Sequence, residues 1–175
     1  MVTRTEELYL EAEADIRNNN FTEAFSKYEQ IIYEDPGFAP AHNSIGWMFK
    51  TQFDNLVKAE LHFRAAIKLD KNYAHSYFHL SSLLLDLERF DELEIFLEDC
   101  LQINAVDKSW VFHRFGVMNE LQHQYGVAIE YYKKALLGSL YNEKIKEYQS
   151  DIERCEIKLS IVKPKSRPWF NFVRK

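Results

Sequence analysis

The chain is short of turn-forming residues, because its 175 residues include only five Gly and four Pro. Together these amount to about 5% of the chain, whereas about 12% is usual in globular proteins. A sandwich or barrel of many short strands needs more turns than this composition provides, so long helices are favoured. The length itself suits one ordinary domain.

Long apolar runs and cysteine motifs are also missing. No window approaches the roughly 18 consecutive apolar residues of a membrane span, and the acidic start does not resemble a signal peptide. Cys100 and Cys155 match no CxxC or zinc-ligand spacing, so we expect two buried, small apolar side chains. The sequence therefore predicts a cytoplasmic protein with no stable membrane insertion, no metal and no other cofactor.

Negative charge dominates the chain except in its C-terminal tail. Residues 163–175 contain five Lys or Arg and no acid, so residues 1–162 hold 27 acids against 17 bases, a net charge of −10. Because phosphate backbones are also negative, we expect this acidic body to repel nucleic acid. The basic tail carries Trp169, Phe170 and Phe172, which suit a ligand for another surface.

A repeat of 34 or 35 residues runs through the sequence. Ala24, Ala59, Leu93 and Ala128 are spaced by 35, 34 and 35 residues. Two further columns keep the same intervals: Tyr28, Phe63, Leu97 and Tyr132, and then Ile31, Ala66, Cys100 and Ala135. Within each repeat these residues form one apolar helical stripe, so each repeat contains a helix in its second half.

A first helix precedes each stripe and is marked by a small residue, which lets two helices approach closely. These residues are Ala12, Gly46, Ser81 and Gly116. We predict helices at 4–17, 21–34, 38–51, 54–69, 73–86, 90–103, 107–122 and 125–138. A ninth, at 142–162, has the apolar stripe of a cap: Ile145, Tyr148, Ile152, Cys155 and Leu159.

These columns resemble the tetratricopeptide repeat (TPR). The fourth repeat agrees best, through Phe112, Phe115, Gly116, Tyr125, Ala128, Tyr132 and Ala135. The resemblance implies an all-α fold, a right-handed alpha-alpha superhelix (solenoid) of four TPR helix-turn-helix repeats plus a C-terminal capping helix. The repeats would occupy about 5–38, 39–73, 74–108 and 109–141 of a domain at 1–162, which the cap at 142–162 closes before the tail at 163–175.

The resemblance also implies a concave groove lined by the first helices. At the matching positions, each repeat carries one large aromatic residue, and histidines and other polar residues lie among them. The predicted partner-binding residues are Tyr9, Asn43, Trp47, Lys50, His75, Phe78, His79, Trp110, His113 and Arg114. Aromatic and Arg side chains dominate protein interfaces. The alternative is that Trp47 and Trp110 pack between neighbouring first helices.

Two specialised uses of this groove are disfavoured. Some TPR proteins clamp a chaperone C-terminus with Lys and Asn, but Tyr9, Glu13, Ser44, His75 and His79 stand at the matching positions here. His75 and His79 have the four-residue spacing of paired metal ligands, but no HExxH motif or nearby Cys supports a zinc site. Free histidines titrate near pH 6.5, so we expect the groove to become more positive in mild acid.

The chain has no phosphate-binding glycine loop or nucleophile elbow, so we predict no enzyme. The predicted function is a protein-protein interaction adaptor or scaffold, which binds a peptide or helical segment of a partner in the groove. The alternative is a self-assembling structural protein. It would form a homo-oligomer in which residues 164–175 of one copy dock on another.

Overall fold

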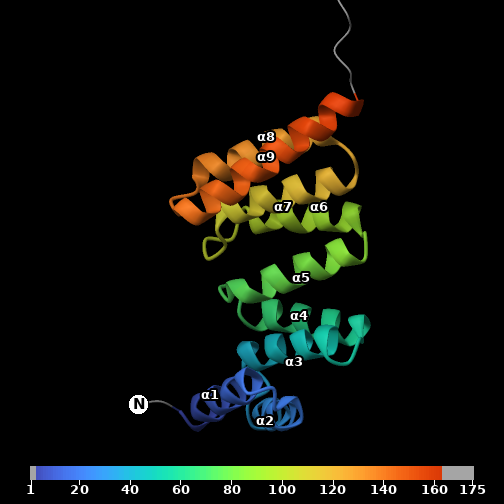
Figure 1. Cartoon of the computed structure of the whole chain (residues 1–175). Coiled ribbons are helices and arrows are strands. Elements are labelled where there is room, and N and C mark those ends of the chain that lie inside the picture. The colour runs from blue at the N-terminus through green and yellow to red at the C-terminus, as the bar shows by residue number, and fades with distance from the viewer. Residues whose placement is uncertain (1–2, 163–175) are drawn as a thin grey trace, which may run out of the picture. The chain divides into compact units, whose positions relative to one another are not determined.

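The computed structural model describes residues 3–162, which are helical apart from short connections (Figure 1). The helices are α1 (Arg4–Arg17), α2 (Phe21–Glu34), α3 (Ala39–Thr51), α4 (Leu56–Leu69), α5 (Ala74–Asp86), α6 (Phe90–Cys100), α7 (Lys108–Leu121), α8 (Tyr125–Gly138) and α9 (Asn142–Val162). These residues contain no strand, so the predicted all-α class is confirmed. The basic tail at 163–175 lies outside the described residues.

The predicted helices are confirmed to within two residues at each end, except at the end of α6. The sequence predicted a helix to residue 103, but α6 ends at Cys100. The backbone N–H groups of Gln102 and Ile103 donate to the carbonyls of Asp99 and Cys100, at 3.0 and 3.2 Å. Bonds between residues three apart tighten the chain into a turn, and the periodicity of the sequence does not reveal this change.

Each hairpin turns through a residue other than glycine in the left-handed region. The φ angles of Asn19, Asp54, Glu88 and His123 are 62°, 48°, 53° and 61°, and each residue lies two positions before the second helix of its repeat. This conformation costs an L-residue about 1–2 kcal/mol. The chain therefore forms these four turns without glycine, in agreement with its low glycine content.

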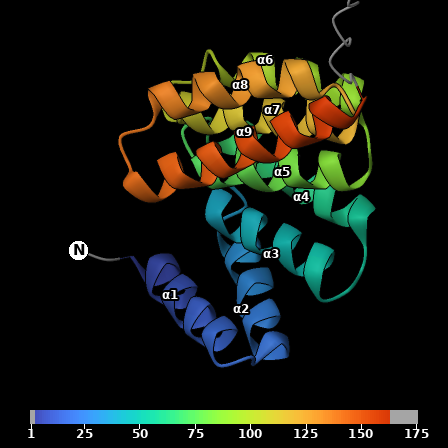
Figure 2. The same cartoon turned by 45° about the horizontal axis from the view of Figure 1, so that its top comes forward.

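The described residues form two compact units, which we treat separately: unit 1, up to Asp107, and unit 2, from Lys108. Figures 1 and 2 label the helices of both units. In unit 1 the two helices of each repeat pack together, and α2 and α4 also pack on the first helix of the next repeat. In unit 2, α8 packs on both α7 and α9. In unit 1 this is the arrangement of stacked helical hairpins, and in unit 2 one hairpin packs on the single helix α9. The single domain predicted for residues 1–162 stays a prediction.

The repeat columns form the core of both units. Their second-helix members, including Tyr28, Phe63 and Tyr132, are fully buried. A Cβ added to Gly46 would lie 2.7 Å from the Phe63 ring, and one added to Gly116 would lie 2.5 Å from the Tyr132 ring. Glycine is therefore needed where a ring from the second helix crosses the first, which confirms the predicted close approach.

The apolar stripe of α9 packs on α8. Cys155 is fully buried in a cluster with Ala128, Ile129 and Tyr132, and Ile152 and Leu159 pack against this cluster. This is the packing expected of a capping helix. No helix within residues 3–162 combines the length and the apolar content needed to cross a bilayer.

Candidate functional site

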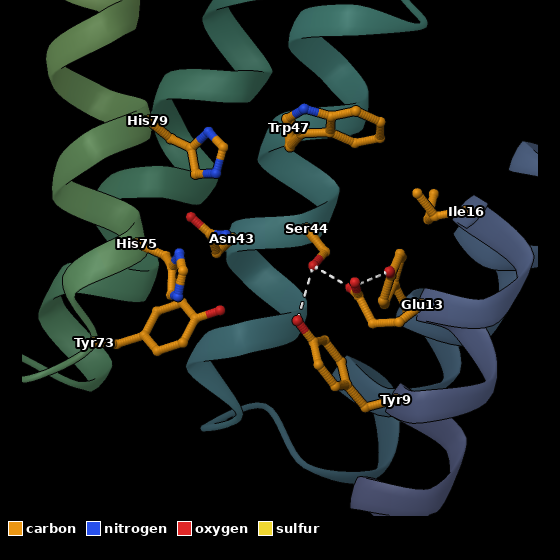
Figure 3. A pocket seen from close by; sticks show the side chains of 10 residues that line it. Tyr9, Glu13, Ile16, Asn43, Ser44, Trp47, Tyr73, His75 and His79 are labelled. Carbon is orange, nitrogen blue, oxygen red and sulfur yellow. Dashed lines mark hydrogen bonds between the residues drawn. The ribbon is translucent and has the colours of Figure 1, made fainter. Parts of the chain in front are cut away.

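Unit 1 contains a polar and aromatic pocket of about 330 Å³ among its first helices (Figure 3). This volume lies at the lower end of the range for ligand pockets, about 300–1,000 Å³. The lining residues come from α1, α2, α3, α5 and the residue before α5: Tyr9, Glu13, Ile16, Tyr28, Asn43, Ser44, Trp47, Tyr73, His75 and His79.

The helical hairpins bring these residues together. Tyr9, Ser44 and His79 come from the first helices of three successive repeats, α1, α3 and α5. Figure 3 shows the side chains of α1 on one side of the pocket and those of α5 on the other, with α3 between them. Side chains far apart in the sequence therefore share one cavity because consecutive hairpins stack.

One wall of the pocket is a hydrogen-bonded network centred on Glu13. The Tyr28 hydroxyl donates to Glu13 Oε1 at 2.6 Å, and Ser44 Oγ donates to the same oxygen at 3.1 Å. The Tyr9 hydroxyl lies 3.2 Å from Ser44 Oγ. Because the serine proton is used toward Glu13, Tyr9 is the donor in this contact. The Glu13 carboxylate thus accepts hydrogen bonds from two hydroxyls. Through Ser44 it also fixes the orientation of the Tyr9 hydroxyl.

The tyrosine hydroxyls of the pocket remain protonated at neutral pH. Burial raises the pKa of Tyr9, Tyr28 and Tyr73 above the usual value of about 10, and the negative charge of Glu13 raises it further. These hydroxyls therefore serve as neutral hydrogen-bonding groups. The field of the Glu13 carboxylate reaches all three rings.

Asn43 supplies a buried amide beside the cavity. Its side chain lines the pocket and the residue is only 5% exposed, but Oδ1 accepts no hydrogen bond from any residue between 3 and 162. A buried polar atom without a partner costs about 1–3 kcal/mol, so such atoms are rare in folded proteins. A half-turn of the carboxamide exchanges its oxygen and nitrogen, so Asn43 can offer an acceptor or a donor to a ligand.

His79, one of the two histidines that line the pocket, is neutral at pH 7. Burial, together with repulsion from His75 and Lys50, lowers the pKa of His79 to about 4. The His79 ring stacks on Phe63 with centroids 5.3 Å apart. The prediction that the groove histidines titrate near pH 6.5 is therefore wrong for His79, because its ring is packed against the core.

Five of the ten predicted binding residues line this pocket: Tyr9, Asn43, Trp47, His75 and His79. Lys50 and Phe78 belong to the same unit but do not line it. The Lys50 ammonium pairs with Asp86 at 2.6 Å, and the Phe78 ring lies edge-on to His75 at 6.2 Å. Trp47 both lines the pocket and packs against the core cluster of the first two repeats, so the packing alternative holds in part.

The other three predicted residues, Trp110, His113 and Arg114, lie on α7 in unit 2. The Arg114 guanidinium lies over the Trp110 ring at 5.6 Å. His113 Nε2 lies 2.9 Å from an oxygen of Asp151, and its ring stacks on Tyr148 at 4.8 Å. His113 therefore contacts the capping helix α9. A binding role for these three residues stays a prediction.

Unit 2 has its own buried carboxylate, Glu120 on α7. Arg154 donates to both of its oxygens, at 2.8 and 2.6 Å, and Lys158 and the Tyr132 hydroxyl donate at 2.8 and 2.7 Å. The hydrogen bonds from Arg154, together with those from Lys158 and Tyr132, hold the pKa of Glu120 well below its usual range. Glu120 is therefore ionised and holds α9 against α7 through Arg154 and Lys158.

Sequence reasoning missed Tyr28 and Tyr73 as pocket residues. Tyr28 belongs to a core column, and its hydroxyl donates to Glu13 of the pocket. Tyr73 begins the helix predicted at 73–86 and is not one of the groove positions of the repeat; in the structure it is the residue just before α5. Among residues 3–162, no three His, Cys, Asp or Glu side chains gather as metal ligands would.

The hairpins and the pocket of unit 1 define a helical-repeat protein. Residues 74–107 match the sequence model of the tetratricopeptide repeat family. This segment is a tetratricopeptide repeat, and the predicted resemblance is confirmed. No curated protein sequence matches the chain.

Solved structures of similar fold support the same conclusion. PilF of Pseudomonas aeruginosa is 16% identical, with a TM-score of 0.66 over 93% of this chain and 78% of that one. A thermophilic TPR protein of Thermus thermophilus, TTC0263, is 15% identical, with a TM-score of 0.64 over 86% and 82%. MamA of Desulfovibrio magneticus RS-1 is 15% identical, with a TM-score of 0.66 over 93% and 95%. The likeness shows that the chain has the TPR fold.

Proposed function

We propose that the protein is a non-enzymatic adaptor that binds a peptide segment of a protein partner at the first helices of unit 1. The pocket is the anchoring point. The observation that carries this proposal is the Asn43 carboxamide, which lines the cavity and is nine-tenths buried, with an oxygen that no described residue satisfies. A ligand would supply a hydrogen bond once the carboxamide turns its oxygen toward the cavity.

The aromatic composition of the pocket also supports peptide binding. Tyr9, Trp47 and Tyr73 combine apolar surface with polar edges. Aromatic side chains of this type are enriched in the central contacts of protein interfaces. Stacked helical hairpins display such side chains on a rigid surface, which limits the entropy lost on binding. Protein binding is also the role that the TPR resemblance implies.

Affinity capture with the full chain tests the proposal. We expect Trp47→Ala to lose proteins that the native chain captures, whereas Val57→Ala should retain them. Val57 is a suitable control because it is 73% exposed on α4 and does not line the pocket. Circular dichroism must show that both variants are folded. If Trp47→Ala captures the same proteins as the native chain, the pocket is not the binding site.

A complex with a captured protein gives a more direct test. Amide hydrogen exchange should slow in α1, α3 and α5, whose side chains line the pocket, and change little in α8. Protection confined to other helices would contradict the proposed site.

The cytoplasmic location expected from the sequence is tested separately by cell fractionation.

Self-assembly is a second candidate, favoured by the charge distribution. Residues 1–162 carry a net charge of −10, whereas residues 163–175 carry five bases and no acid. Opposite charges of this size favour docking of the tail of one copy on the body of another. Light scattering should then show oligomers that grow with concentration and disappear when residues 164–175 are deleted. A monomer at all concentrations would rule out this candidate.

A further inference from the structure

The pocket of unit 1 contains an acid without a Lys or Arg partner. Glu13 is the only acidic residue among the ten that line it, and none of the ten is Lys or Arg. Within residues 3–162, Glu13 forms no ion pair, and its two donors are the neutral hydroxyls of Tyr28 and Ser44.

Two lysines of unit 1 are paired with acids other than Glu13, and Arg17, four residues after Glu13 on α1, forms no ion pair with Glu13. Lys27 on α2 lies 2.7 Å from Asp15 and 3.3 Å from Glu11. Lys50 on α3 lies 2.6 Å from Asp86. No cation among residues 3–162 therefore forms an ion pair with Glu13, and its negative charge can act on a group that enters the cavity.

Unit 2 shows what a similar carboxylate binds when a cation is present. In both units a fully buried tyrosine of the second helix donates to a glutamate of the first: Tyr28 to Glu13 at 2.6 Å, and Tyr132 to Glu120 at 2.7 Å. At Glu120, Arg154 of α9 adds a two-pronged guanidinium contact. At Glu13 the corresponding cation is missing from the described residues.

We propose that the pocket of unit 1 binds the guanidinium of an arginine side chain from the partner segment, with Glu13 as its counter-ion. This inference rests on the proposed function, since it specifies the chemistry of the bound peptide. A guanidinium has five donors in a planar fork, which suit a carboxylate such as that of Glu13.

The aromatic walls favour arginine over lysine. A guanidinium stacks on aromatic faces and is more weakly hydrated than an ammonium group, so it enters a half-enclosed pocket at lower cost. Tyr9, Trp47 and Tyr73 supply such faces around the pocket (Figure 3). An acidic or phosphorylated side chain is disfavoured, because the Glu13 carboxylate would repel it.

The test uses the full chain with two small probes, acetyl-arginine amide and acetyl-citrulline amide. Citrulline has nearly the same shape as arginine but carries no charge. In ¹H–¹⁵N NMR spectra we expect saturable shifts of the Glu13, Asn43 and Ser44 amides with the arginine probe. The citrulline probe should bind about 10-fold more weakly or worse, as expected for loss of a charged hydrogen bond. Equal binding of the two probes would overturn the inference.

Glu13→Gln provides the matching variant. Gln keeps an oxygen that accepts from Tyr28 and Ser44, so the fold is retained while the charge is lost. Arginine binding should fall about 10-fold or more in Glu13→Gln. The control Glu7→Gln makes the same charge change on an exposed part of α1 and should leave binding unchanged. Unchanged binding in Glu13→Gln would exclude Glu13 as the counter-ion.

The two proposals can fail separately. If Trp47→Ala loses a captured partner but Glu13→Gln keeps it, the adaptor function stands and the arginine inference fails. If Trp47→Ala keeps every partner, the proposed site itself fails. Acetyl-lysine amide is the third probe and tests the preference for a guanidinium over an ammonium group. If it binds as tightly as the arginine probe, that preference is contradicted.

Discussion

The hydroxyl of Tyr28 on α2 donates a 2.6 Å hydrogen bond to the carboxylate of Glu13 on α1. The Tyr28 ring is fully buried in the core, whereas Glu13 lines the pocket. One side chain therefore joins the packing of the first hairpin to the polar network of the candidate site. Changes at this residue should affect stability and pocket geometry together.

Tyr28→Phe should destabilise the protein by about 1–2 kcal/mol, because Glu13 loses a donor at a partly buried position while the ring is kept. Urea unfolding followed by circular dichroism measures the change. The matched control is Tyr33→Phe on the same helix, where the side chain is 89% exposed and the loss of a hydroxyl should have little effect. Equal effects of the two substitutions would contradict the role of the hydrogen bond.

Gly46→Ala should destabilise the protein by about 1–3 kcal/mol, because the new methyl group overlaps the Phe63 ring. Gly126→Ala on α8 makes the same change where no atom lies within 4 Å. There Ala should stabilise the helix by up to about 1 kcal/mol. Thermal unfolding of the two variants should therefore shift in opposite directions, and a stabilised Gly46→Ala would show that the helices do not pack this closely.

Glu88→Gly should stabilise the protein by about 0.5–1 kcal/mol, since it relieves a left-handed residue at an exposed turn. Asn19→Gly tests the equivalent turn of the first repeat. Its gain should be smaller, because Asn tolerates φ angles near 60° better than Glu does. Chemical denaturation measures both changes. A loss of stability in Glu88→Gly would contradict the positive φ at this turn.

The native protein should lose stability as the pH falls from about 6.5 to about 4. The folded-state pKa of His79 is about 4, below the ordinary value of about 6.5, so the unfolded chain binds the proton more readily in this window. The contribution of neutral His79 to the free energy of unfolding is therefore complete above pH 6.5 and is lost as the pH falls toward 4.

His79→Phe keeps a ring against Phe63 but removes this titration, so its stability should depend less on pH between 7 and 5. His62, whose pKa burial also lowers to about 4, titrates in both proteins and cancels in the comparison. Urea unfolding at pH 7 and pH 5 gives the slope of the free energy of unfolding against pH for each protein. Identical slopes would show that His79 is not held neutral by its surroundings.

Sequence periodicity predicted the helical hairpins and their core with few errors. The columns through Ala24, Tyr28 and Ile31 repeat at a fixed interval, and a buried helical stripe requires this spacing. The end of α6 was predicted three residues too late, because hydrogen bonds between residues three apart close a turn without changing the apolar pattern. Fold class and helix phase are thus local properties that the sequence displays directly.

The candidate site was predictable only in part. The register placed Tyr9, Trp47 and His79 on first helices, where they line the pocket. It placed Lys50 and Phe78 beside them, although neither lines the cavity. The importance of Glu13 was also hidden, because its partners Tyr28 and Ser44 lie 15 and 31 residues away.

The sequence by itself therefore determined that the chain folds into helical hairpins and which residues form their buried stripes. Spacing along one helix is enough to fix both. Only the tertiary structure decided which side chains share a cavity, that burial keeps His79 neutral, and that the donors to Glu13 are hydroxyl groups. These properties depend on distances and solvent access between helices, which arise only when the hairpins stack.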